Sequence, residues 1–135
     1  MALWRFLDYE PAPSNCPVRD WYAAQDAFVQ AEFDAALVTL GATDDWDDPD
    51  LREFKSFTDK PQHLGLGQVR FETNREDRKR QFRVIGLRRT EQRELILLMG
   101  FEKNGRSPKP PNAFEIALEL RTRFEEGEGE LHEHV

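Results

Sequence analysis

The sequence has a single cysteine, Cys16, among its 135 residues, so no disulfide can form within one chain. This agrees with a reducing compartment, where structural disulfides are rare. Long hydrophobic runs are also missing: the longest apolar stretch, residues 95–101, is far shorter than the ~20 residues of a membrane-spanning helix. The N-terminal segment lacks the basic start, apolar stretch and cleavage site of a secretory signal. We therefore expect a cytoplasmic protein that does not enter a membrane.

Several motifs that carry chemistry in other proteins are missing as well. The sequence has no CxxC pair, no Gly-rich phosphate loop, no Gly-x-Ser-x-Gly elbow and no internal repeat. His132 and His134 alternate near the C-terminus, but two imidazoles without a third ligand on a flexible segment make a poor metal site. We therefore expect no metal and no cofactor.

The composition that remains is that of a globular domain. Hydrophobic residues make up 39% of the chain and charged residues 33%, a balance too apolar for a wholly disordered chain and too polar for a membrane protein. At ~100–200 residues per domain, the length predicts one soluble domain. We place that domain at residues 1–125, because residues 126–135, EGEGELHEHV, hold little apolar material and predict a flexible acidic tail.

The net charge of −7 is unevenly distributed along the chain. Residues 1–50 carry a charge of −9 and residues 111–135 a charge of −5, whereas residues 51–110 carry +7. Clustered lysine and arginine attract phosphates even when the whole molecule is acidic. The middle block therefore predicts a polyanion-binding surface, and the alternative is a set of ordinary solvated arginines on exposed strands.

The N-terminal part predicts a strand followed by helix. Residues 3–9 are bulky and aromatic, which suits a short strand. Apolar residues then recur at steps of three and four over residues 18–40, with Pro17 at the first helical position and Gly41 at the end. Asp26 is a candidate N-cap, so a short helix breaking into a longer one fits the pattern as well as one straight helix.

The remainder predicts an antiparallel sheet and a last helix. Five aspartates in residues 42–50 predict an exposed loop, and residues 51–57 predict one or two helical turns. Strands follow at residues 66–72, 81–87 and 95–101, with connections short enough for hairpins, and a helix follows at residues 113–125. The predicted class is α+β, with an N-terminal strand and helical hairpin packed on an antiparallel β-meander and a C-terminal helix.

Four stretches of sequence together resemble a known family. They are Cys16-Pro17-Val18-Arg19-Asp20-Trp21, Gly65-Leu66-Gly67-Gln68-Val69-Arg70-Phe71, Phe82-Arg83-Val84-Ile85, and Leu97-Leu98-Met99-Gly100-Phe101-Glu102-Lys103 with Pro108 beyond. In their order and spacing the chain resembles, over roughly residues 3–125, the RelE/ParE toxin superfamily, most closely its phage-derived HigB-like branch. Active members with this RelE-like fold are toxins of type II toxin–antitoxin systems that cleave mRNA on the ribosome. The ParE branch inhibits gyrase, which is a third option for this chain that the sequence does not single out.

The resemblance implies a metal-independent endoribonuclease in which the ribose 2′-hydroxyl attacks the adjacent phosphorus. Fixed cations then offset the charge that grows on the phosphorane oxygens. Arg70, Arg83 and Lys103 match the family's basic positions and are the predicted catalytic residues. The implied partners are a cognate helix-turn-helix antitoxin, the ribosome and mRNA; the oligomeric state stays open.

Other residues are secondary candidates. Arg80, Lys79, Arg106 and Lys55 are candidates for RNA-backbone contacts, with a solvated charge as the alternative for each. His63 is a candidate acid or base, because its ordinary pKa lies near neutrality. The alternative role of Arg70 and Arg83 is an ion pair across the sheet with Glu72 or another carboxylate.

The chain departs from the family pattern mainly at proton-transfer positions. Met99 stands where the family often has His, Asn104 where it has a second Lys, Gln68 where it has Glu, and Phe82 where it has Tyr. These departures favour a second hypothesis, in which the chain keeps the fold as a non-catalytic module that binds a protein or nucleic acid through its basic sheet. The enzyme hypothesis fails if Arg70, Arg83 and Lys103 do not converge on one concave surface.

Overall fold

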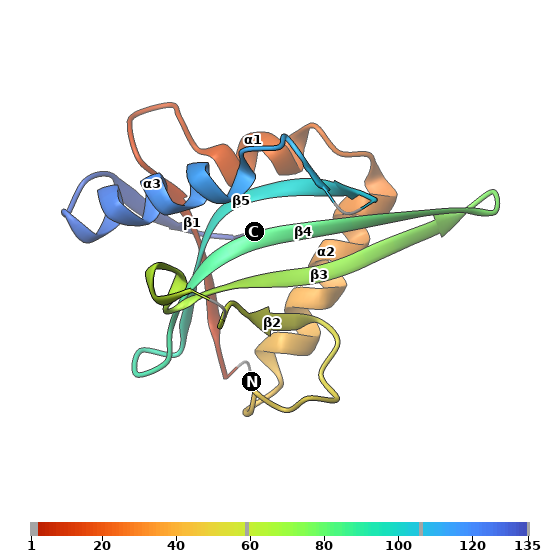
Figure 1. Cartoon of the computed structure of the whole chain (residues 1–135), viewed down its shortest axis with the longest axis horizontal. Helices are drawn as coiled ribbons and strands as arrows, with labels where there is room; N and C mark the ends of the chain where they lie inside the picture. The colour runs from red at the N-terminus through yellow and green to blue at the C-terminus, as the bar shows by residue number, and fades with distance from the viewer. Residues whose placement is uncertain (1–2, 59, 106, 135) are drawn as a thin grey trace.

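The computed structural model of the chain describes residues 3–58, 60–105 and 107–134. This part forms a seven-stranded sheet with the strand order β2-β3-β4-β5-β1-β7, and β6 pairs with β5 off this path (Figure 1). The strands are β1 Arg5–Glu10, β2 Phe54–Ser56, β3 Leu66–Arg75, β4 Arg78–Arg89, β5 Glu94–Asn104, β6 Ser107–Lys109 and β7 Glu130–Glu133. The helices are α1 Pro17–Ala23, α2 Ala27–Gly41, the 3₁₀ helix η1 Pro61–His63 and α3 Ala113–Glu125.

The helical segment after β1 is two helices rather than one. Helix α1 begins at Pro17, where a missing N–H costs nothing, and ends at Ala23. Asp26 then caps α2, because its Oδ1 accepts hydrogen bonds from the backbone N–H groups of Phe28 and Val29, both at 3.0 Å. The candidate N-cap is thus confirmed, and it accounts for the break in the helical pattern.

Strands β3, β4 and β5 form the predicted antiparallel meander. Strands β3 and β4 are longer than predicted, because only Glu76 and Asp77 separate them, both with positive φ as tight hairpin turns require. The β3–β4 hairpin therefore extends well past the rest of the sheet (Figure 1). Residues 95–101 of β5 are all buried, which confirms the prediction of a strand covered on both faces.

Helices cover both faces of the sheet, and the α+β class is confirmed. Helix α2 packs behind the sheet and α3 in front of it (Figure 1). The core behind the sheet centres on Phe33 and Leu40 of α2, with Val69, Phe71, Phe82 and Val84 from the strands. The core in front joins Ala113, Ala117 and Leu120 of α3 to Ile85, Ile96, Leu98 and Phe101. None of the helices in the described residues is long and apolar enough to cross a membrane.

The prediction for residues 51–57 was wrong, and that for residues 42–50 was incomplete. Residues 54–56 form β2, which pairs with residues 67–69 of β3. In the acidic loop, Trp46 is only 2% exposed and stacks on Trp4 with ring centroids 4.1 Å apart. Its Nε1 donates to the Leu40 carbonyl at 2.9 Å, so one aromatic side chain anchors a loop whose aspartates remain exposed.

The predicted flexible tail is also wrong for residues 130–133. These residues form β7, which pairs antiparallel with β1, while β1 pairs in parallel with β5 on its other side. The strand is held by backbone bonds to β1 and by the side chain of His134, which is 7% exposed and lies 3.0 Å from Asp8. Backbone pairing and polar contacts order a segment that has little apolar surface to bury.

Candidate anion-binding site

Two arginines lie directly opposite each other in the centre of the sheet. Arg70 of β3 pairs with Arg83 of β4 in the strand register, and opposed residues project to the same face. Next to them, Arg83 pairs with Phe101 of β5, and Lys103 lies two residues further along the same face. Helix α3 covers the other end of this face (Figure 1). Arg70 and Arg83 are partly exposed.

The three predicted catalytic residues converge on one concave surface. A cavity of about 260 Å³ is lined by Lys55, Gln68, Arg70, Arg83, Phe101, Lys103 and Phe114. The lining therefore combines four cations, one amide and two aromatic rings. Phe114 is not among the predicted site residues: it lies in the predicted last helix, and the Pro-rich segment before α3 gives no signal of where its ring comes to lie.

Neither arginine of the opposed pair is neutralised. Among the described residues neither forms an ion pair with a carboxylate, so the alternative role as surface ion pairs does not hold for them. Arg70 donates from Nε to the Arg52 carbonyl at 3.0 Å, and Arg83 donates from Nη1 to the Phe82 carbonyl at 2.9 Å. Burial, followed by the charge of Arg70, lowers the pKa of the Arg83 guanidinium, while Glu72 acts in the opposite direction. Two like charges facing each other destabilise the sheet.

A second cavity of about 480 Å³ adjoins this pair on the side of α2 and β2. Arg70 and Arg83 line both cavities. Three carboxylates also line the second one, Glu32, Glu53 and Glu72. The cationic cavity is thus bordered by acidic groups, which limits the area over which a polyanion can bind.

The secondary candidates divide between the two faces of the sheet. Lys55 lines the cationic cavity. Lys79 projects to the same face but pairs with Glu72 at 3.1 Å. Arg80 is three residues from Arg83 and so projects to the opposite face, where Glu102 accepts from its Nε and Nη2 at 3.1 and 2.7 Å. Arg80 therefore does not belong to the site.

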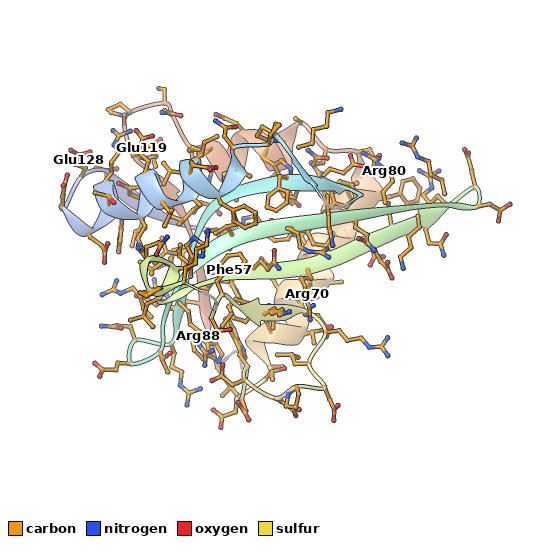
Figure 2. All side chains as sticks on the ribbon, viewed as in Figure 1. Phe57, Arg70, Arg80, Arg88, Glu119 and Glu128 are labelled. Atoms are coloured by element: carbon orange, nitrogen blue, oxygen red, sulfur yellow. The ribbon has the colours of Figure 1, made fainter. Side chains whose placement is uncertain are left out.

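Arg80 and Arg70 lie in separate regions of the sheet, Arg70 beside β2 and Arg80 near the end of β5 (Figure 2). Arg106 lies outside the described residues. His63 lies on η1 with its ring 5.8 Å from that of Phe57, and it is not among the residues lining either cavity. The predicted acid or base is therefore not at the cationic cavity.

Much of the remaining basic block is neutralised inside the fold. Arg88 forms two hydrogen bonds with the Asp47 carboxylate, at 2.8 and 3.1 Å, and holds the pKa of that carboxyl below its usual range. Arg93 pairs with Asp44 at 2.7 Å. The acidic loop thus binds arginines near the β4–β5 turn and does not cover the cationic cavity, since none of its residues lines it.

Comparisons of the chain with protein-family models, with curated proteins and with solved structures each found no match.

Proposed function

We propose that this protein is a ribosome-dependent mRNA endoribonuclease, the toxin of a type II toxin–antitoxin pair, and that Arg70, Arg83 and Lys103 hold the RNA backbone. The observation that carries this proposal is the opposed Arg70–Arg83 pair, neither of which forms an ion pair with a carboxylate of the described residues. Two facing cations, both partly buried, cost stability in the free protein. A phosphate bound between them removes that cost and accepts charge-assisted hydrogen bonds from both.

The reaction needs a site of this composition. The 2′-oxygen attacks the neighbouring phosphorus while the bond from phosphorus to the 5′-oxygen breaks, which leaves a cyclic phosphate and a 5′-hydroxyl. Negative charge rises on the non-bridging oxygens, and guanidinium and ammonium groups fixed around them stabilise this state without a metal. Phe114 lines the same cavity and is only partly buried, so its ring is the one on which an unpaired base can stack, whereas Phe101 is 3% exposed and serves as the floor of the cavity.

The proposed RNA contact is local rather than spread over the molecule. The chain carries a net charge of −7, and three glutamates line the cavity beside the cations. We therefore expect a plot of log K against log salt concentration for short single-stranded RNA to have a slope of about −2. Each of three neutralised phosphates contributes ~0.7 to that slope. A broad basic surface would give a much steeper slope.

A second candidate function is a non-catalytic module that binds RNA, or another polyanion, at the same cavity. The observation that favours it is the absence of histidine among the described residues that line the cavity. General acid–base catalysis works best with a group that titrates near the working pH. Without one, the cations would bind RNA and lower the barrier by electrostatics alone.

The experiment compares three chains under controlled expression, with growth followed alongside primer extension on an abundant mRNA. One is the parent and one is the triple variant Arg70→Ala, Arg83→Ala, Lys103→Ala. The control variant is Arg78→Ala, Arg93→Ala, Lys109→Ala, which removes the same charge from residues that line neither cavity.

The toxin proposal predicts growth arrest and cuts in translated mRNA for the parent and the control, and neither for the cavity variant. A folded parent that does not cut but binds single-stranded RNA, with binding lost only in the cavity variant, establishes the second candidate. A parent that neither cuts nor binds RNA overturns both.

A further inference from the structure

Three potential metal ligands meet where β1 and β7 pair. Glu10 of β1 lies opposite Glu130 of β7 in the strand register, and His132 projects to the same face two residues further on. The His132 Nε2 lies 3.2 Å from Oε1 of Glu10 and 4.0 Å from Oε2 of Glu130. One ligand atom from each of the three residues lies within 4.8 Å of the others.

These separations suit a small divalent ion. Bonds of about 2.0–2.1 Å from zinc to its ligands place the ligands of a tetrahedral site about 3.3 Å apart. The pair formed by His132 and Glu10 already has this separation. Glu130 needs to approach His132 by about 0.7 Å from its present 4.0 Å to reach the same spacing, and to close on Glu10 as well, from which it lies within 4.8 Å. Its side chain is 76% exposed, so its rotamer is free to make this movement.

The scaffold fixes two of the three ligands. Glu10 and His132 are 23% and 33% exposed and stand on strands that are bonded to each other. Sites built on paired strands are held more firmly than sites on loops. The exposed position of Glu130 leaves a path for entry and room for a water molecule as a further ligand. The strand register places two carboxylates opposite each other, an arrangement that costs stability and that a bound cation would relieve.

We infer that Glu10, Glu130 and His132 form a binding site for a divalent transition-metal ion such as zinc, with a coordination position open to water. One imidazole and two carboxylates suit zinc and its neighbours in the first transition series. Magnesium and calcium prefer all-oxygen sites with six or more ligands. The site lies outside both cavities lined by Arg70 and Arg83, so it stands independently of the proposed function.

Bound metal would fasten the C-terminal strand to β1. Strand β7 has four residues and lies at the edge of the sheet, where strands detach most readily. An ion shared by Glu10 and the two β7 ligands binds only when these strands are paired. It therefore stabilises the paired state by a free energy that grows with the logarithm of the metal concentration relative to the dissociation constant.

The test is calorimetric titration of the full chain, freed of metal with a chelator, with zinc chloride and then with magnesium chloride. The variants are Glu10→Gln and His132→Gln. Glu133→Gln is the matched control, because it removes a carboxylate from the same strand, and Glu133 pairs instead with Arg5. Circular dichroism of each metal-free chain establishes that the fold is retained.

We expect the parent to bind one zinc ion per chain. The zinc affinity should fall by at least about tenfold in both ligand variants and stay unchanged in the control, and magnesium should give no heat of binding. Zinc should also raise the melting temperature of the parent and the control but not of His132→Gln. Three results would overturn the inference: no zinc binding to the folded parent, equal binding by His132→Gln, or a loss in Glu133→Gln as large as in Glu10→Gln. The last would indicate general attraction to an acidic surface.

Discussion

Replacing His134 with alanine tests how the C-terminal strand is held. The side chain is 7% exposed, with Nδ1 at 3.0 Å from Asp8 and Nε2 at 3.3 Å from Asp34. Asp8 is 1% exposed and keeps Arg19 as a second partner, with Nε of Arg19 at 2.9 Å. Breaking a buried charged pair costs ~3–5 kcal/mol, and because Asp8 retains Arg19 we expect about 3 kcal/mol. The imidazole also contacts the ring of Phe33, with centroids 5.2 Å apart, and this packing is lost too.

The loss should depend on pH in a defined direction. Burial acts to lower the pKa of His134. The hydrogen bond and charge of Asp8, followed by those of Asp34, raise it by a larger amount, so the pKa in the folded state lies above its ordinary value of 6.5. A raised pKa means that the folded state binds the proton more tightly than the unfolded state. The stabilisation is therefore complete below pH 6.5 and is lost as pH rises through the pKa of the folded state.

The assay is urea unfolding of the parent and of His134→Ala at a series of pH values from 6 to 9, in the presence of a metal chelator. We expect the difference in the free energy of unfolding to be largest at the acid end and to shrink towards pH 9. Hydrogen exchange should show faster opening of β7 in the variant, since this edge strand can detach before the domain unfolds. His132→Ala is the matched control: the side chain of His132 is 33% exposed, so its removal should lower the free energy of unfolding by less. A difference that stays constant across the pH range would refute the reasoning.

Three further predictions concern the sheet and the acidic loop packed against it. Gly100→Ala should lower the free energy of unfolding by ~1–3 kcal/mol in urea titration, because the added methyl group meets the Trp21 indole; a neutral result would contradict the packing. Trp46→Phe should cost about 1–3 kcal/mol by the same measurement, because the indole N–H donates to two backbone carbonyls near the end of α2; an unchanged midpoint would show that these bonds contribute nothing. Arg83→Ala should raise the free energy of unfolding, because it removes a half-buried cation that faces Arg70. The same variant should bind single-stranded RNA more weakly, with the slope of log K against log salt smaller by ~0.7. A destabilised variant would count against the site.

The features that the sequence predicted correctly depend on neighbouring residues. The N-cap at Asp26 needs only the two N–H groups that follow it, and the continuous apolar run in residues 95–101 has to be covered on both faces wherever it lies. The order of strands in the meander follows from short connections between consecutive strands. The convergence of Arg70 and Arg83 was expected from the resemblance to a toxin family, and the strand register accounts for it.

The features that the sequence did not predict depend on partners far along the chain. Residues 130–133 have no pattern of their own that predicts a strand, and they become one because β1 offers an unpaired edge. The same pairing brings Glu10 to His132, which no spacing in the sequence indicates. The position of Phe114 beside Lys103 and the pairing of Arg88 with Asp47 arise in the same way. Local sequence thus determined the helices and the strands of the meander, whereas contacts between distant segments produced β2 and β7 and decided which charges are neutralised and which remain available to bind.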